Sequence, residues 1–209
     1  MATFFDPLSY ENLGASIARA LEDQPVRALG ELKKFDGAGI YALYYSGDHP
    51  AYHPLALVNQ KLPGSWAIYV GKAEAENARK GNPVQLEGEV GPKLYNRMRK
   101  HAQSIAASTN LDIGDFHYRA LTVVPTWVPL AEIVAIRLNH PVWNVIVDGL
   151  GNHDPGKGRY MGVCPRWDTL HPGRTWASRL QPRIESKEQI QQDALAHLRN
   201  YPHELLSTL

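Results

Sequence analysis

Two short aromatic segments bounded by glycines constrain the fold of this 209-residue chain more than any other feature. Residues 39–45 read GIYALYY, and residues 66–71 read WAIYVG after the Pro63-Gly64 turn. Short runs of this kind, rich in aromatic and β-branched residues and closed by glycine, are typical of β-strands. The two segments can therefore pair in one sheet.

The remaining periodicity supplies helices and a third strand. Apolar residues at helical spacing predict helices over residues 9–22, 92–107 and 129–139, and alternation predicts a strand over residues 116–124. In the helix at 129–139, the expected core face is Leu130, Ile133, Val134 and Leu138. The order helix, strand, strand, helix, strand, helix predicts an α+β fold with a small three-stranded sheet flanked by helices.

Two long connections interrupt these elements. Residues 46–65 contain three prolines, and residues 73–91 contain a further proline among several glycines. Structureless connections longer than about 12–15 residues are usually functional or disordered, so we expect two insertions here. His49 and His53 are four apart, but Pro50 and Pro54 argue against a helix that would bring them together on zinc, and we interpret them as loop residues.

Composition bounds the class of protein. The length allows one domain over residues 1–209, and a single cysteine, Cys164, excludes a disulfide framework. No signal peptide or long apolar run is found, so we expect a cytoplasmic protein that does not span a membrane.

The net charge is only +1, but residues 149–183 carry six lysines or arginines against two acids. Charge is therefore sorted by segment, which suits a protein that grips nucleic acid locally.

Several polar residues follow the two strands at regular spacing. Arg97 and His101 are four apart on the predicted helix, so they emerge on one face and form a candidate phosphate site. Glu132 lies in the first turn of the next predicted helix, outside the apolar stripe of that helix. Pro141 and Asn144 follow Glu132 by nine and twelve residues.

Together these blocks resemble the GIY-YIG nuclease family. The sequence has GIY at 39–41, YVG at 69–71 with valine for the usual isoleucine, the Arg97–His101 pair, Glu132 and Asn144, in the order that the family shows. The resemblance covers residues 39–144 and implies a small antiparallel sheet flanked by helices as a catalytic core. The insertion at 73–91 is longer than in the minimal module.

The resemblance also implies roles for these residues. Tyr41 would act as the general base on water or relay to it, with His101 assisting, and either could be the final proton acceptor. Tyr69 would hold the phosphate or the water, and Asn144 would brace the site.

The residue types agree with phosphodiester hydrolysis. Glu132 is one hard carboxylate, suited to a Mg²⁺ (or Mn²⁺) ion that takes its remaining ligands from water and phosphate. Arg97 offers a planar fork of donors that keeps its charge. A lone carboxylate favours a one-metal mechanism.

The segment 149–183 is the candidate DNA-recognition region, and a C-terminal helix is expected over 186–200, where Ser186 and Gln189 form a capping box. Arginines interleaved with aromatic residues are typical of contacts to phosphates and guanine edges. The alternative is a loop that packs its tryptophans and solvates its arginines. The candidate DNA contacts are Lys157, Arg159, Arg166, Arg174, Arg179 and Arg183.

Two other nuclease or nucleotide motifs are not supported. GNHDPGK at 151–157 matches a P-loop as far as its lysine, but Gly158 replaces the required Ser or Thr, so no nucleotide cofactor is expected. Asp168, Glu185 and Lys187 echo a PD-(D/E)xK site, but the last two flank a helix start instead of lying on a strand.

The length leaves no room for the separate DNA-binding domains of homing and repair enzymes, so the chain resembles the stand-alone type II restriction endonucleases of the family. Such an enzyme would cut both strands of a palindromic duplex site as a homodimer, and the arginine-rich segment favours a GC-rich site. Two alternatives stay open: a DNA-binding module with an inactive nuclease-like core, and a repair or structure-specific nuclease of this family.

Overall fold

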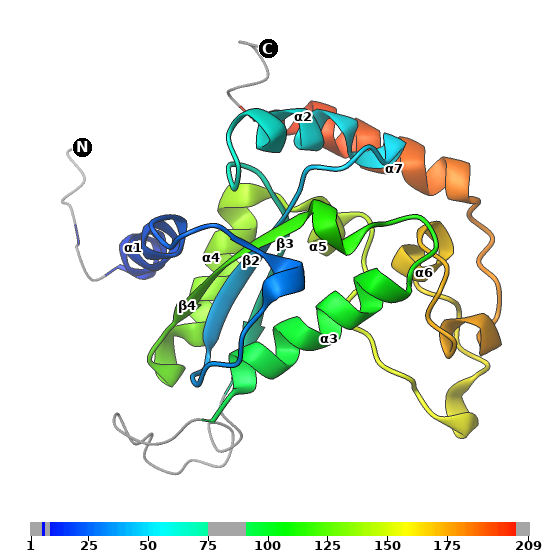
Figure 1. The fold of residues 1–209 in the computed structure, drawn as a ribbon, viewed down its shortest axis with the longest axis horizontal. Helices are drawn as coiled ribbons and strands as arrows, with labels where there is room; N and C mark the ends of the chain where they lie inside the picture. The colour runs from blue at the N-terminus through cyan, green and yellow to red at the C-terminus, as the bar shows by residue number, and fades with distance from the viewer. Residues whose placement is uncertain (1–5, 7–8, 75–90, 204–209) are drawn as a thin grey trace.

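The computed structural model describes residues 6, 9–74 and 91–203, and an antiparallel four-stranded sheet lies at its centre (Figure 1). The strand order is β1-β4-β2-β3, with β2 hydrogen-bonded to β3 on one side and β4 on the other. The strands are β1 (Arg27–Ala28), β2 (Gly39–Tyr45), β3 (Ala67–Ala73) and β4 (Phe116–Thr122). The α+β class is confirmed. The extra strand, β1, has only two residues, too few to produce an alternating pattern in the sequence.

Helices cover both faces of the sheet. α3 lies on one face, and α1 and α4 lie on the other (Figure 1). α2 and α7 lie together beyond one end of the sheet, and the short α5 and α6 fill the space between. The helices are α1 (Tyr10–Glu22), α2 (His53–Lys61), α3 (Lys93–Ala107), α4 (Val128–Asn139), α5 (Val142–Val145), α6 (Arg166–Leu170) and α7 (Lys187–Asn200).

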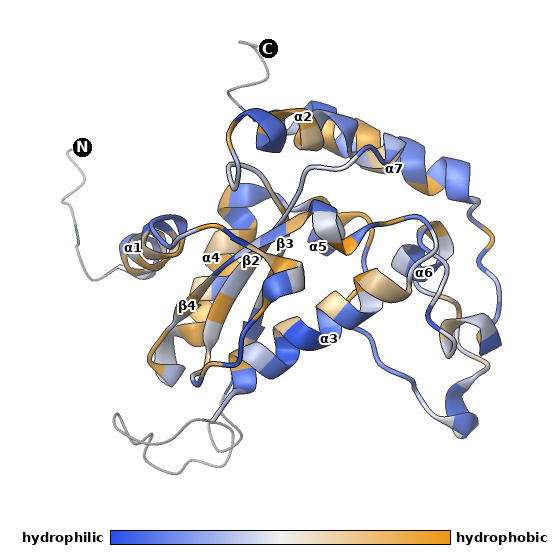
Figure 2. Ribbon diagram, in the orientation of Figure 1, coloured by the Kyte–Doolittle hydropathy of each residue, from blue (hydrophilic) through white to orange (hydrophobic). Residues whose placement is uncertain are grey.

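The central strand β2 is buried on both faces, which explains its continuous apolar sequence. Tyr41 and Leu43 belong to the core between the sheet and α3, whereas Ile40 and Ala42 belong to the core beneath α1 and α4. Figure 2 shows the contrast between the largely apolar strands and the hydrophilic outer surface of α3. Helices therefore pack against both faces of β2, and the side chain of Tyr41 lies on the face covered by α3.

The predicted core face of α4 was wrong at two of its four positions, since Leu130 and Val134 are partly buried but the other two are exposed. Ile133 and Leu138 are 56% and 59% exposed, and the buried residues are Val128, Ala131 and Ala135. Small residues let α4 approach the sheet and α1 closely. Because α4 is apolar almost all round, helical periodicity could not identify the face that packs.

The predicted loop over 46–65 was also wrong. It contains a 3-10 turn at Pro50–Tyr52 followed by α2, and Pro54 lies in the first turn of that helix. Proline is tolerated there because its missing N–H has no intrahelical acceptor to lose. His53 starts α2, whereas His49 precedes the turn, and no cluster of three metal-ligating side chains occurs among the residues that the structure describes.

The C-terminal segment follows the predicted pattern. Ser186 caps α7 by accepting a hydrogen bond from the Gln189 backbone N–H at 3.2 Å, and Ile190, Ala194 and Leu198 are buried. Of the predicted insertion at 73–91, residues 75–90 lie outside the described residues. Among the described helices, none has the length and apolar character needed to cross a membrane.

The contact between α1 and α4 depends on a glycine. A Cβ atom at Gly14 would lie 2.2 Å from Cγ2 of Val134, a branched side chain with little freedom to move. We expect Gly14→Ala to reduce the free energy of unfolding by about 1–3 kcal/mol, despite the better helix propensity of alanine. Denaturant unfolding measures this. Gly30→Ala is the control, because its nearest neighbour would be 3.9 Å away; equal stability of the two variants would contradict the packing argument.

Candidate active site

Three aromatic rings meet between the sheet and α3. Tyr41 on β2 and Tyr69 on β3 have ring centroids 6.1 Å apart. His101 on α3 lies 5.7 Å from Tyr41 and 5.2 Å from Tyr69. The structure thus brings together three of the residues that the sequence analysis singled out.

Two features of β3 aim these tyrosines. Leu43 pairs with Tyr69 but Tyr44 pairs with Ala67, so Ile68 is bulged out of register. The bulge lets both Ile68 and Tyr69 face the α3 side of the sheet. Opposite Tyr41, a Cβ atom at Gly71 would lie 2.5 Å from the Tyr41 hydroxyl and 2.8 Å from Cε1 of Tyr69. The glycine of the YVG motif therefore leaves the space that both rings occupy.

Burial sets the protonation state of Tyr41. Desolvation, reinforced by the neighbouring Tyr69, raises the pKa of Tyr41 well above its usual value, although the Arg97 guanidinium acts in the opposite direction. Burial likewise raises the pKa of Tyr69. Both phenols are protonated in the unliganded site, so Tyr41 needs additional positive charge nearby before it can take a proton from water.

His101 is held in its neutral form. Burial, followed by the charges of Arg97 and Arg174, lowers its pKa to about 3. Its Nε2 atom and the Tyr41 hydroxyl have no hydrogen-bond partner within the described part of the chain. His101 is therefore a neutral imidazole beside an unpaired buried phenol, and it can accept a hydrogen bond but is a poor base in this state.

Arg97 and Glu132 line one pocket of about 410 Å³ with Tyr69. Arg97 comes from α3 and Glu132 from α4, which lie on opposite faces of the sheet, and they meet beyond the edge strand β3 (Figure 1). The other lining residues are Lys72, Ala73, Glu74, Lys93, Asn96 and Lys100. One carboxylate and several cations therefore surround an open volume next to the motif tyrosines.

Lys72 neutralises the carboxylates of this pocket. Its ammonium lies 2.9 Å from Glu74 and 3.2 Å from Glu132. Burial alone lowers the pKa of Lys72, but the hydrogen bonds and charges of the two glutamates raise it overall. Glu132 is thus paired with a cation, on the side of the pocket nearest β3.

Asn144 acts on the backbone of the YVG motif. Its side-chain oxygen accepts from the Val70 N–H at 2.8 Å, and its amide nitrogen donates to the Val70 carbonyl at 2.8 Å. The side chain replaces the neighbouring strand that the free edge of β3 lacks, and it fixes the residue between Tyr69 and Gly71.

A family model described as the Eco29kI GIY-YIG domain matches residues 33–198, more than half of the chain. The chain belongs to the GIY-YIG nuclease family. The match extends beyond the motif blocks to include the C-terminal segment and most of α7, and its description is that of a restriction endonuclease GIY-YIG domain. No curated protein matches the sequence.

The pocket suits the divalent metal that GIY-YIG restriction nucleases typically use. Glu132 is a partly exposed carboxylate that lines an open volume and is already paired with a cationic group. A hard divalent ion that keeps several waters and takes oxygen ligands from phosphate needs only one or two protein carboxylates. Glu132 would hold such an ion, and Glu74 lies within reach of the same ammonium.

The basic residues of the C-terminal segment divide into two groups, those that are exposed or partly exposed and those that are bound within the protein. Lys157, Arg159 and Arg179 are exposed, and the turn at Lys157–Arg159 projects away from the sheet (yellow in Figure 1). Arg183 is partly exposed and bonds Glu185 and the Cys164 carbonyl. These four remain predicted DNA contacts.

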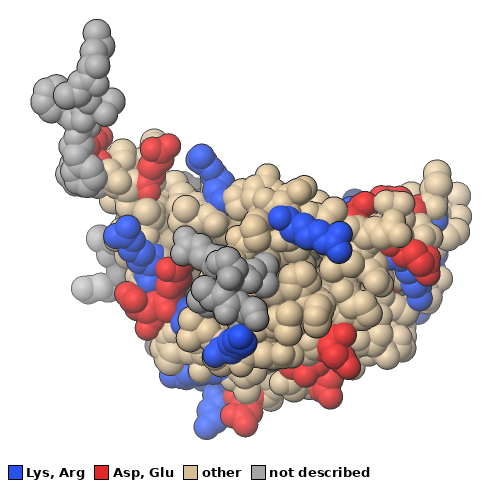
Figure 3. Space-filling model, turned by 90° about the horizontal axis from the view of Figure 1, so that it is seen from above, with Lys and Arg blue, Asp and Glu red and all other residues tan. Residues whose placement is uncertain are grey.

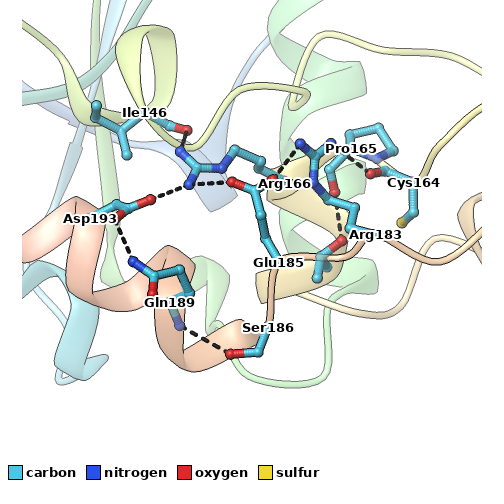
Figure 4. A network of polar contacts seen from close by, with 10 residues as sticks. Ile146, Cys164, Pro165, Arg166, Arg183, Glu185, Ser186, Gln189 and Asp193 are labelled. Carbon is cyan, nitrogen blue, oxygen red and sulfur yellow. Dashed lines mark hydrogen bonds and ion pairs between the residues drawn. The ribbon is translucent and has the colours of Figure 1, made fainter.

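Arg174 and Arg166 correct that prediction. Arg174 is only 7% exposed, and its guanidinium donates hydrogen bonds to Asp168 and to backbone carbonyls. Arg166 pairs with Asp193 and Glu185 and donates to the Ile146 carbonyl at 2.9 Å, which ties the segment to α7 (Figure 4). Both guanidiniums are bound to carboxylates of the protein: Arg174 to Asp168, six residues before it, and Arg166 to Glu185 and Asp193, which come from the distant start of the last helix region. Their role in this structure is structural.

The sequence analysis missed several pocket residues. Lys93 and Lys100 lie four before and three after Arg97, so helical spacing could have placed them on the same face. Lys72 directly follows the YVG motif, which is a local signal. His153, which contacts Arg97, had no signal because its position depends on the fold of the C-terminal segment.

The lowered pKa of His101 predicts how the free energy of unfolding changes in acid. The unfolded chain protonates this histidine near pH 6.5, whereas the folded protein lowers its pKa to about 3. The unfolded state therefore binds more protons in this window, and the free energy of unfolding should fall as the pH decreases from 6.5 toward 3. We expect His101→Gln to make this fall shallower in denaturant titrations at a series of pH values. His53→Gln, at an exposed position on α2, is the control; an unchanged slope for His101→Gln would contradict the assignment.

Proposed function

We propose that this protein is a type II restriction endonuclease that hydrolyses one phosphodiester bond in each strand of duplex DNA at a specific palindromic site. The convergence of Arg97 and Glu132 on one pocket beside Tyr69 carries this proposal. The match to a restriction endonuclease domain supports it, because the match includes the C-terminal segment as well as the motif core.

The chain's own residues supply binding and proton handling. Arg97 binds the non-bridging oxygens of the scissile phosphate through its planar fork. A divalent ion at Glu132 would polarise the phosphoryl oxygen and support the departing alkoxide. The positive charge of Arg97, and of an ion if one were held at Glu132, would favour ionisation of Tyr41, whose proton passes to bulk water; the phenolate then accepts the proton of the attacking water. Before ionisation, the adjacent neutral His101 can accept a hydrogen bond from the phenol and orient it.

The DNA backbone is proposed to run along α3. Lys93, Arg97 and Lys100 share one face of this helix and line the pocket. By contrast, the face drawn in Figure 3, over α2 and α7, shows acidic and basic side chains interspersed without a basic stripe. The exposed Lys157, Arg159 and Arg179 extend from the C-terminal segment as candidates for base or phosphate contacts.

A homodimer follows from the number of sites. Each chain has one such pocket among its described residues, and cutting both strands of a palindrome calls for two pockets related by the twofold axis of the DNA. We place the protein in the cytoplasm, in keeping with its single free cysteine.

Plasmid cleavage tests the proposed function. We expect discrete fragments with Mg²⁺ and none with EDTA, and we expect Glu132→Gln and Arg97→Lys each to lower the rate by at least about 100-fold, since each removes a group that stabilises the transition-state charge. Glu22→Gln and Arg137→Lys, at exposed positions, are matched controls that should cut normally.

The other outcomes separate the alternatives. A smear or single nicks would indicate a repair or structure-specific nuclease, and intact but retarded DNA would indicate a binding module. Wild-type rates in both Glu132→Gln and Arg97→Lys would show that the site is elsewhere.

The proposed path of the backbone is tested by salt dependence. Each phosphate contact contributes about −0.9 to the slope of log K against log salt concentration. With Ca²⁺ in place of Mg²⁺, Lys100→Ala should make this slope shallower by about 1, whereas Arg99→Ala on another face of α3 should leave it unchanged. Equal effects of the two substitutions would argue against a backbone path along the pocket face.

A further inference from the structure

The C-terminal segment reaches the pocket through the loop at residues 149–153. The Arg97 Nη1 atom donates to Nε2 of His153 at 3.2 Å. The backbone of the same loop lies against the other amino group, because a Cβ atom at Gly151 would be 2.8 Å from Nη2 and 3.6 Å from the Tyr69 hydroxyl. Arg97 is therefore bounded on one side by this loop and open on the other to the pocket.

The direction of the Arg97–His153 hydrogen bond is fixed by chemistry. A guanidinium has only donors, so Nε2 of His153 must be the acceptor, and the proton of the neutral ring resides on Nδ1. Partial burial and the charges of Arg97, Lys100 and Arg174 lower the pKa of His153. The ring is thus kept neutral and able to accept.

A buried arginine holds the loop in place. Arg174 donates to the carbonyls of Gly149, Leu150 and Asn152 at 2.9, 3.0 and 3.2 Å. The guanidinium is in turn fixed by Asp168, whose Oδ1 accepts from Nε at 2.6 Å. It also lies over the rings of Trp167 and Trp176, 4.6 and 4.7 Å from their centroids. Three carbonyl groups of the loop backbone are thereby hydrogen-bonded to one buried guanidinium.

We propose that His153 is a positioning residue for Arg97, which directs the guanidinium fork toward the scissile phosphate, and that the Asp168–Arg174 pair holds the 149–153 loop for this purpose. The C-terminal segment then completes the active site in addition to contacting DNA. This inference rests on the proposed function, in which Arg97 binds the phosphate.

The kinetic test compares three substitutions at His153, a surface position where folding should be unaffected. His153→Gln keeps an acceptor and should retain the single-turnover cleavage rate within about threefold, whereas His153→Ala should lose about tenfold, the value of one charge-assisted hydrogen bond. His153→Lys, which can only donate, should lose at least as much as His153→Ala. Asn152→Ala is the control, because its carbonyl and not its side chain bonds Arg174. Equal rates for the Gln, Ala and Lys variants would overturn the proposal. They would show that cleavage does not depend on a hydrogen-bond acceptor at position 153.

A second measurement does not depend on cleavage. The ¹⁵N signals of the His153 ring, assigned by their loss in His153→Gln, report its tautomer in the protein without DNA. The Nδ1–H form is expected, and an Nε2–H or doubly protonated ring at neutral pH would overturn the proposal. A wild-type chain that leaves plasmid intact would instead refute the nuclease function, so the two failures are distinguishable.

Discussion

The burial of the motif tyrosines between the sheet and α3 is the constraint on which the site depends. Because β2 is covered on both faces, the Tyr41 side chain has no route to solvent along its own strand. Burial then keeps the phenol protonated and His101 neutral. The proposed function requires positive charge beside Tyr41, and the neighbouring pocket is lined by Arg97 and Lys100 of α3 and by Glu132 of α4.

The edge strand β3 is where these elements meet. An unpaired edge allows side chains from the two faces of the sheet to approach one another, which a central strand would prevent. Asn144 bonds the backbone N–H and carbonyl of Val70 on the strand edge, and Lys72 extends from the same strand toward Glu132. The strand therefore contributes an aromatic ring, an ammonium and a fixed backbone to the pocket, while α3 and α4 contribute Arg97 and Glu132.

The C-terminal segment is held by the buried Asp168–Arg174 pair and by partly exposed pairs of Arg166 with Glu185 and Asp193, and this changes how its basic residues are interpreted. Arg174 lies between two tryptophans and beside Asp168, and Arg166 connects α6 to α7. Such pairs offset the cost of desolvating each charge only when their geometry is complete, as it is for Arg174 with its carbonyl acceptors. They fix the irregular backbone of the segment, whereas Lys157, Arg159 and Arg179 remain exposed.

The sequence by itself determined the helices α1, α3 and α4, the two motif strands, the capped last helix and the residue types of the site, because these depend on local periodicity and spacing. Only the tertiary structure decided which face of α4 packs, that Pro54 lies in the first turn of a helix, and that β1 joins the sheet. It also decided that Arg174 is internal and that His153 meets Arg97. Periodicity tells which side chains share a face, but it does not tell what covers that face. Arg97 and His153 are 56 residues apart, so their contact forms only when distant segments are packed together.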